Sequence, residues 1–313
     1  MTVSLVTKIA RPISSALSVA LAMDNVGKLD SYGKLGAWYP SSLFTASEQG
    51  VVYDPRDLST MFQDSAGTTP VTADGQPVGL VLDKSKGLVL GSELVTNGDF
   101  SNGATGWSLG SGWSISGGAA ASAGSNQFQA LSQTVATAAG KTYEVKMSVT
   151  FTSGSLLIRL GSGINKAEVS SGGEKIFSLV ADGNEISFLS SAAGFEFVGS
   201  IDNISVRELA GNHALAPNSS SRPLKTSTGA SQWTNYDAVD DVLNTTFPSA
   251  LGSNCTIARA NVGGAPTILT GQTIGTSYAD STDNAGLIII DRALTGQETT
   301  DVTAWLTAKG ATS

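Results

Sequence analysis

ELVTNGDF at residues 93–100 and FVGSIDNISV at residues 197–206 are the two stretches that decide the fold. Asn97-Gly98 in the first stretch is a dipeptide that favours a tight turn. Phe100 and, a few residues later, Trp107 are large enough to fill a core between two sheets. These features fit a β-sandwich in which the first stretch contains a tight turn and supplies aromatic residues to the core.

The sequence between these stretches has the texture of a β-protein. Short segments of alternating apolar and polar residues are separated by Gly, Ser and Asn, and such alternation is typical of strands with one buried face. The clearest of them are residues 142–149, 155–160, 175–180 and 201–206. Because helical periodicity is almost absent here, the pattern predicts an antiparallel sandwich or jelly roll over residues 92–209.

The residues before this domain divide into two segments. In residues 1–35, apolar side chains recur at every fourth position from Ile9 to Leu21, which predicts a helix or an extended arm that anchors the chain. Its partner is either its own domain or another copy. In residues 36–91, four prolines disfavour helix at the residues before them, at 39, 54, 69 and 76. We expect an extended docking segment without a core of its own.

The residues after it divide likewise. Residues 210–232 are polar and rich in Asn, Ser and Pro, which predicts a linker with His213 in a solvated loop. Residues 233–313 contain a few more strands and then a helix from Thr295 to Lys309, in which Thr295 can cap the start and Leu306 belongs to the buried face. The expected class is mainly β, ending in one helix.

Composition excludes several functions. The 313 residues carry a net charge of −8, with 14% charged residues and no basic run, which argues against nucleic-acid binding. The one cysteine and one histidine exclude an intrachain disulfide and a zinc site with several imidazoles, and they leave His213 as the only imidazole base. No stretch approaches the roughly 18 to 20 apolar residues of a membrane span. We expect no catalytic residues and no required cofactor.

The two stretches that decide the fold also resemble the first and last strands of jelly-roll carbohydrate-binding modules of the galactose-binding-like superfamily. The resemblance covers residues 92–209. It implies a structural calcium ion held by Asp99 and Asp202, since carboxylate oxygens are ligands that calcium prefers. The alternative is that Asp99 caps a turn and that Asp202 binds neighbouring backbone amides.

Sugar recognition needs flat aromatic faces flanked by amides or hydroxyls. Four residues of the jelly roll are candidates for such contacts: Trp113, Gln127, Phe128 and Gln129. Trp107 and Phe195 are assigned to the core instead.

Two stretches of the last domain, residues 233–243 and 285–295, look like the opening and closing elements of a laminin-G or concanavalin-like lectin sandwich. The domain is short for that family, so the resemblance implies a truncated sandwich. Asp240 and Asp241 could bind a metal ion, but a turn between strands is the favoured interpretation.

Residues 38–85 are similar to a segment that recurs in virion proteins of tailed bacteriophages. This resemblance implies a head fibre, tail fibre or spike on the particle surface, attached to other virion proteins through residues 1–91. A glycan of the host surface is the expected ligand, and a homo-oligomer, with a trimer favoured, would multiply weak sites. The alternatives are a non-adhesive decoration or cement protein and, less favoured, a depolymerising tailspike, whose chemistry needs only two acids about 5 to 10 Å apart.

Overall fold

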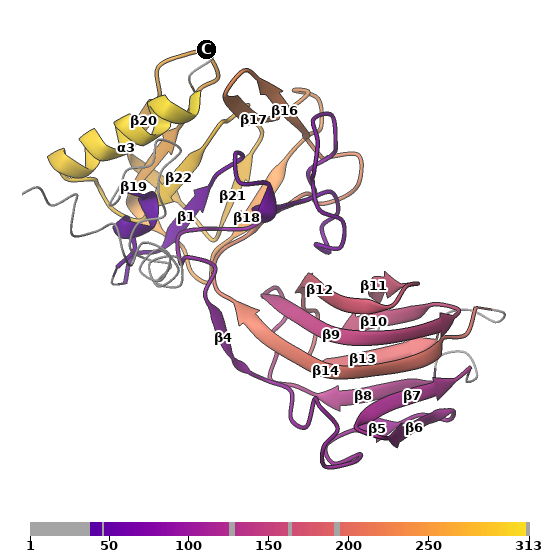
Figure 1. The fold of residues 1–313 in the computed structure, drawn as a ribbon. Helices are drawn as coiled ribbons and strands as arrows, with labels where there is room; N and C mark the ends of the chain where they lie inside the picture. Colours follow the sequence, from indigo (N-terminus) through magenta and orange to yellow (C-terminus); the bar gives the residue numbers. More distant parts are fainter. Residues whose placement is uncertain (1–37, 46, 125–128, 162–164, 191–194, 311–313) are drawn as a thin grey trace, which may run out of the picture.

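The computed structural model describes residues 38–310 apart from 46, 125–128, 162–164 and 191–194. This part of the chain forms two β-sandwiches, one below the other in Figure 1, and carries a single α-helix near its C-terminal end. The expected mainly β class is confirmed. The expected anchor at residues 1–35 lies outside the described residues. No helix in the described ranges is long and apolar enough to cross a membrane.

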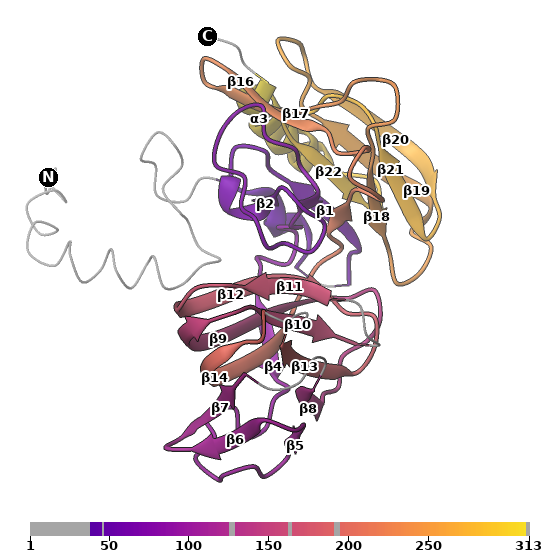
Figure 2. The ribbon, with the colours of Figure 1, turned by 90° about the vertical axis from the view of Figure 1, so that its right-hand side faces the viewer.

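The lower sandwich is a jelly roll of two antiparallel sheets that spans residues 90–209 (Figures 1 and 2). The first sheet has the order β12 (Gly173–Val180), β9 (Thr142–Ser153), β14 (Val198–Leu209), β7 (Ala119–Ala123) and β6 (Trp113–Ser116), with β4 (Leu90–Glu93) paired to β14. The second has the order β11 (Asn165–Val169), β10 (Leu156–Leu160), β13 (Glu185–Ser190), β8 (Ala130–Thr134) and β5 (Ser108–Leu109).

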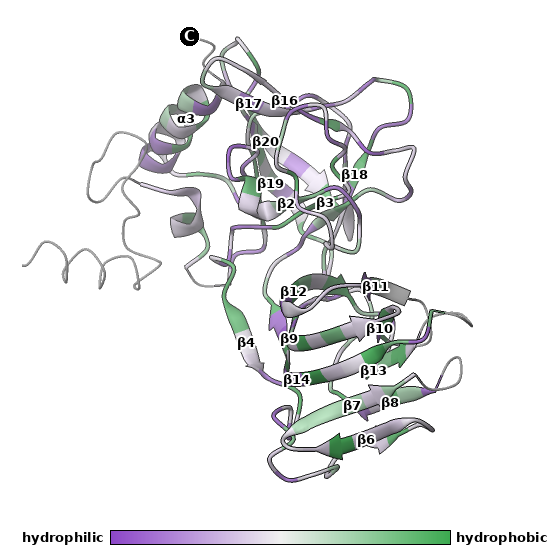
Figure 3. Cartoon of the chain, turned by 45° about the vertical axis from the view of Figure 1, so that its right-hand side comes forward, coloured by the Kyte–Doolittle hydropathy of each residue, from purple (hydrophilic) through white to green (hydrophobic). Residues whose placement is uncertain are grey.

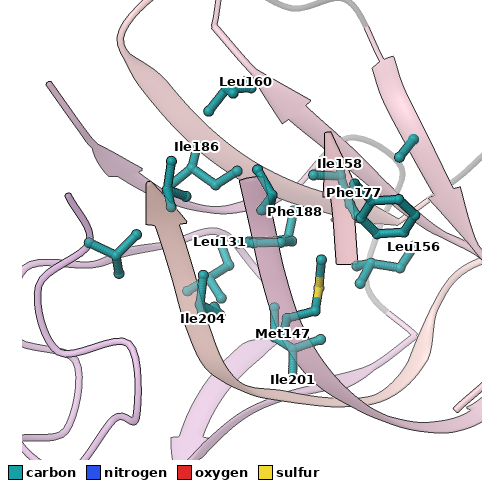
Figure 4. Packing of buried hydrophobic residues seen from close by; sticks show 14 of the residues in the cluster. Leu131, Met147, Leu156, Ile158, Leu160, Phe177, Ile186, Phe188, Ile201 and Ile204 are labelled. Atoms are coloured by element: carbon teal, nitrogen blue, oxygen red, sulfur yellow. The ribbon is translucent and has the colours of Figure 1, made fainter. Parts of the chain in front are cut away.

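Strict alternation along the strands builds the jelly-roll core. Hydropathy alternates along β9 and β14 in Figure 3, and every second residue of β9 from Val145 to Val149 is buried. These side chains meet Phe188 and other residues of the opposite sheet in one cluster (Figure 4). Trp107 belongs to the same cluster, as expected, and its Nε1–H donates to the carbonyl of Asn97 at 3.0 Å.

The two stretches that decide the fold lie side by side. The amide of Ile204 donates to the carbonyl of Gly98 at 2.9 Å. A Cβ atom on Gly98 would lie 2.0 Å from the carbonyl oxygen of Ile204, a distance that real Cβ atoms do not reach. Asn97 before it has the left-handed φ of 54° that Asn tolerates in turns. The Asn-Gly pair is therefore required by the close approach of β14.

We call residues 38–89 and 210–310 together the outer sandwich. One sheet has the order β1 (Gly50–Tyr53), β22 (Leu287–Ile290), β19 (Gly252–Arg259) and β20 (Thr267–Ile274). The other has the order β2 (Met61–Phe62), β3 (Leu80–Val81), β15 (Ala214–Leu215), β18 (Leu243–Thr246) and β21 (Ser277–Asp280). The hairpin of β16 (Leu224–Thr228) and β17 (Ser231–Asn235), the short 3-10 helices η1 (Pro40–Leu43) and η2 (Leu58–Thr60), and α3 (Gly296–Gly310) complete it.

The structure differs from the expected extended docking segment at residues 36–91. β1 pairs with β22, so that Val51 lies opposite Ile289, and all four residues of β1 are buried. The prolines do keep this region free of α-helix, but its apolar residues complete sheets whose other strands lie near the C-terminus. The jelly roll is thus inserted between two halves of the outer sandwich.

Residues 210–232 likewise differ from the expected linker. They contain β15, β16 and the first residues of β17, and β15 pairs with both β3 and β18. His213, expected in a solvated loop, is 6% exposed. The exposed polar residues of this segment also form hydrogen bonds within the turn that precedes β16, where Asn218 accepts from two serines.

The C-terminal helix α3 is tied to the first half of the outer sandwich. Thr295 and Glu298 form a capping box, in which the Glu298 amide donates to the Thr295 hydroxyl at 3.3 Å and the Thr295 amide donates to the Glu298 carboxylate at 2.7 Å. Val302 and Leu306 are fully buried against the β1-β22-β19-β20 sheet. At the other end, the Lys309 ammonium donates to both carboxylate oxygens of the buried Asp54 at 2.7 Å.

Candidate functional site

Trp113, the aromatic residue expected to contact sugar, belongs to the jelly-roll core. It is 6% exposed, its ring stacks on Phe197 at 6.2 Å between centroids, and its Nε1–H donates to the carbonyl of Gln129 at 3.1 Å. The reason is the alternation of β6, which turns this residue inward. Gln129 is half-buried, and its side chain accepts a hydrogen bond from the Ser111 amide. Gln127 and Phe128 lie outside the described residues.

Phe195, expected in the core, is instead 66% exposed. Its carbonyl accepts a hydrogen bond from the amide of Ser155 at 2.9 Å, which places it beside the start of β10. The next aromatic residue, Phe197, is fully buried and takes the core position. Among the described residues of the jelly roll, Phe195 is the exposed large aromatic side chain.

The two aspartates expected to hold calcium each accept hydrogen bonds from the residues that follow them, Asp99 in a loop and Asp202 within β14. The Asp99 carboxylate accepts from the amide of Ser101 at 3.2 Å and from its hydroxyl at 2.9 Å, and these bonds lower the pKa of Asp99. The Asp202 carboxylate accepts from the amide and the side chain of Asn203 at 2.6 and 3.0 Å. Both arrangements agree with the turn-capping alternative, and calcium binding by these residues stays a prediction.

The acidic loop of the outer sandwich also has the geometry of a turn. The Asp237 carboxylate accepts from the amides of Val239, Asp240 and Asp241, and the Asp241 carboxylate accepts from the Asp237 amide at 2.9 Å. These hydrogen bonds match the favoured interpretation of Asp240 and Asp241 as turn residues.

One surface of the jelly roll places polar side chains in a row. On β10, β13 and β8 the core side is taken by residues such as Ile158, Phe188 and Leu131, so the alternate residues face outward. Arg159 lies opposite Ser187, and Ser187 lies opposite Ser132, across three adjacent strands. Neighbouring strands are about 4.8 Å apart. A guanidinium and two hydroxyls thus follow one another across the sheet.

The next outward row of the same face is apolar. Leu157 on β10 lies opposite Leu189 on β13, which lies opposite Ala130 on β8. Leu157 and Leu189 are 8% and 3% exposed although they face away from the core. We call the six residues of the two rows the β10-β13-β8 face; they are Arg159, Ser187, Ser132, Leu157, Leu189 and Ala130.

Chemically, the β10-β13-β8 face joins hydrogen-bonding groups to an apolar strip. Arg159 can only donate hydrogen bonds, whereas the serine hydroxyls both donate and accept. The sequence signal for this face is weak, because residues 156–160 are apolar apart from Arg159 and residues 185–190 include the adjacent apolar pair Phe188 and Leu189. The alignment of Arg159 with Ser187 and Ser132 depends on the register of three strands, which the sequence pattern does not specify.

A second polar cluster lies inside the outer sandwich. The buried carboxylate of Asp280 accepts from Arg259 at 2.7 Å, from the Tyr236 hydroxyl at 3.1 Å and from Asn284. Burial raises the pKa of Asp280, while the Arg259 guanidinium acts to lower it. The carboxylate is enclosed by these partners, so the cluster serves to join β19 and β21.

Comparison with known proteins gives similarities of structure alone. No family model matches the chain, and no curated protein matches it. Among solved structures, it is similar to the N-terminal CBM22-1–CBM22-2 tandem domain from Paenibacillus barcinonensis Xyn10C, with 12% sequence identity and a TM-score of 0.27, over 72% of this chain and 96% of that chain. Neither a binding residue nor a function of this chain follows from that similarity.

Proposed function

We propose that this chain is a structural protein of a tailed-bacteriophage particle, a fibre or spike, whose jelly roll binds a host-surface glycan without catalysing a reaction. In this proposal the outer sandwich attaches the protein to other virion proteins and holds the jelly roll away from them. The row of Arg159, Ser187 and Ser132 on three adjacent strands is the observation that carries the binding function.

The chemistry of the β10-β13-β8 face suits a sugar. Each sugar hydroxyl both donates and accepts hydrogen bonds, and the hydroxyl of the half-buried Ser132 can meet both needs. The C–H faces of a sugar ring need apolar surface, and Leu157 and Leu189 in the adjacent row offer little of it, since they are 8% and 3% exposed. Phe195, which lies beside the start of β10, adds an exposed aromatic side chain.

The virion role is supported by the resemblance of residues 38–85 to a segment of phage virion proteins. Because this segment contributes β1, β2 and β3 to the outer sandwich, its partners would meet a folded surface and not an extended arm. Several copies in a homo-oligomer would raise the avidity of weak glycan sites.

A decoration or cement protein is the second candidate. The low exposure of the β10-β13-β8 face favours this candidate, because Ser187 and Leu189 at its centre are each only 3% exposed. A ligand could reach mainly the half-buried Arg159 and Ser132 at the two sides.

Glycan arrays of bacterial surface polysaccharides, probed with the full chain, test the proposal. We expect binding that Arg159→Ala weakens by about 10-fold, equivalent to one charge-assisted hydrogen bond of about 1.4 kcal/mol. Lys146→Ala is the matched control, because it removes the same charge from the other sheet of the jelly roll. Absence of binding across the array, or equal loss in both variants, would favour the cement protein.

The aromatic contribution is tested separately on the same array. Phe195→Ala is expected to weaken binding, whereas Ile176→Ala, which removes a 53% exposed apolar side chain from β12, is expected to leave it unchanged. Release of reducing sugar from a bound polysaccharide would contradict the non-catalytic part of the proposal.

A further inference from the structure

The single histidine of the chain lies where the two sandwiches join. The ring of His213 is buried, and both of its nitrogens are hydrogen-bonded. Nδ1 accepts from the backbone amide of Asp83 at 2.8 Å, so Nε2 carries the proton of the neutral ring and donates to the carbonyl of Leu209 at 3.1 Å. Asp83 follows β3 of the outer sandwich, and Leu209 ends β14 of the jelly roll.

Asp83 is itself a junction for the outer sandwich. Its carboxylate accepts from the amides of Val52 and Ser85 at 2.8 Å, from the Ser85 hydroxyl at 2.7 Å and from the Asn212 amide at 2.9 Å. The imidazole of His213 therefore links the last strand of the jelly roll to a residue that fixes the edge of β1.

Packing around this junction leaves little room. A Cβ atom on Gly211 would lie 3.1 Å from both the Asp83 carboxylate and the His213 ring. Leu80, Leu82 and Leu209 form a small buried cluster shared by the two sandwiches. We call Asp83, Leu209, Gly211 and His213, together with this cluster, the neck.

We propose that His213 is an acid-sensitive latch: its neutral ring fixes the jelly roll against the outer sandwich, and protonation of Nδ1 loosens the neck. A protonated ring carries a hydrogen on both nitrogens. Nδ1–H would then point at the Asp83 amide N–H, so two donors would face each other without an acceptor. The hydrogen bond from the Asp83 amide, which lies within the outer sandwich, is then lost. The ring can separate the two donors only by turning away from Asp83, which also breaks its hydrogen bond to the Leu209 carbonyl of the jelly roll, while the strands within each sandwich keep theirs.

The electrostatic surroundings set the direction of the response. Burial lowers the pKa of His213 below its ordinary 6.5, and the Asp83 carboxylate acts to raise it. Tyr53 of β1 lies near Asp83, and its phenol stays neutral because burial raises its pKa. Since the pKa of the folded histidine lies below that of the unfolded one, its contribution to stability is complete above pH 6.5 and is lost as the pH falls below that value.

Asp83 acts in the opposite sense. Burial raises the pKa of its carboxyl, so the folded state takes up this proton more readily than the unfolded chain does. Acidification therefore removes the unfavourable buried charge of Asp83, while it places an unfavourable buried charge on His213. A variant that removes only the imidazole titration separates the two effects.

His213→Asn is that variant, because an amide oxygen can accept from the Asp83 amide and does not titrate. The distance between the sandwiches can be followed by fluorescence energy transfer between dyes on Thr150→Cys in the jelly roll and Val239→Cys in the outer sandwich. Both positions are exposed, and the native Cys255 is fully buried. We expect the wild-type distance distribution to broaden between about pH 7.5 and about pH 5, and that of His213→Asn to stay unchanged.

NMR titration of the wild-type imidazole gives a test that needs no substitution at position 213, since the chain has a single histidine. The latch predicts an Nε2–H tautomer at neutral pH and a midpoint below 6.5 that coincides with the broadening. A distribution that stays narrow through the titration of His213, or equal broadening in His213→Asn, would overturn the proposal.

Discussion

At the scale of single residues, the structure assigns Trp113 to the core and not to a sugar-binding surface. Its sequence neighbours are small and polar, which is typical of an exposed binding loop, yet its ring stacks on Phe197 in the core. The alternation Trp113, Ile115 along β6 contained the information, because both residues face the same side of a strand. The small polar neighbours predict an exposed Trp113, but the side of β6 on which the residue lies places its ring in the core.

Trp113→Ala therefore tests packing and not sugar binding. Removing a buried aromatic side chain leaves a cavity, and we expect a loss of about 3–5 kcal/mol in the free energy of unfolding. Chemical denaturation of the full chain measures it, with the exposed Ser114→Ala as control. A Trp113→Ala protein as stable as the wild type would show that the ring is not in the core.

Gly98→Ala tests the close contact between the two stretches that decide the fold. The added Cβ would lie 2.0 Å from the Ile204 carbonyl, so β14 must shift or lose the Ile204–Gly98 hydrogen bond. We expect destabilisation of about 1–3 kcal/mol. At Gly275 a Cβ meets nothing within 4 Å, so Gly275→Ala is the matched control and should unfold close to the wild-type midpoint.

At the scale of elements, local patterns were sufficient for the jelly roll and for α3. The alternation of residues 142–149 predicts β9, and the Thr295 cap predicts the start of the helix. The partner of β1 could not be predicted in this way. Its four residues have no period that identifies β22 as the neighbour, because strand pairing depends on a surface assembled far away along the chain.

The capping box of α3 predicts an acid-dependent contribution to stability. Hydrogen bonds from Arg292 lower the pKa of Glu298 from 4.5 to about 2, so the folded state holds the charged form more tightly than the unfolded chain does. This contribution is present above pH 4.5 and is lost as the pH falls toward about 2. Glu298→Gln should flatten the pH dependence of unfolding in this range. An unchanged dependence would show that the ion pair adds nothing.

At the scale of the whole molecule, the outer sandwich is built from two halves of the chain that flank the jelly roll. Its stability should therefore depend on both halves. A fragment of residues 210–310 lacks β1, β2 and β3, and we expect it to show no cooperative unfolding transition, whereas an arm that merely docks could be removed without effect. Circular dichroism of this fragment during heating distinguishes a sandwich that needs β1, β2 and β3 from one that folds without them.

The pairing of β1 with β22 joins the two halves of the outer sandwich. Val51 and Ile289 lie directly opposite each other, at a spacing that a disulfide can bridge. In the double variant Val51→Cys and Ile289→Cys, mild oxidation should form one intrachain bridge, seen as faster migration on a non-reducing gel and as two blocked thiols. The pair Val51→Cys and Thr150→Cys should form none. Failure of the first pair to bridge would contradict the account.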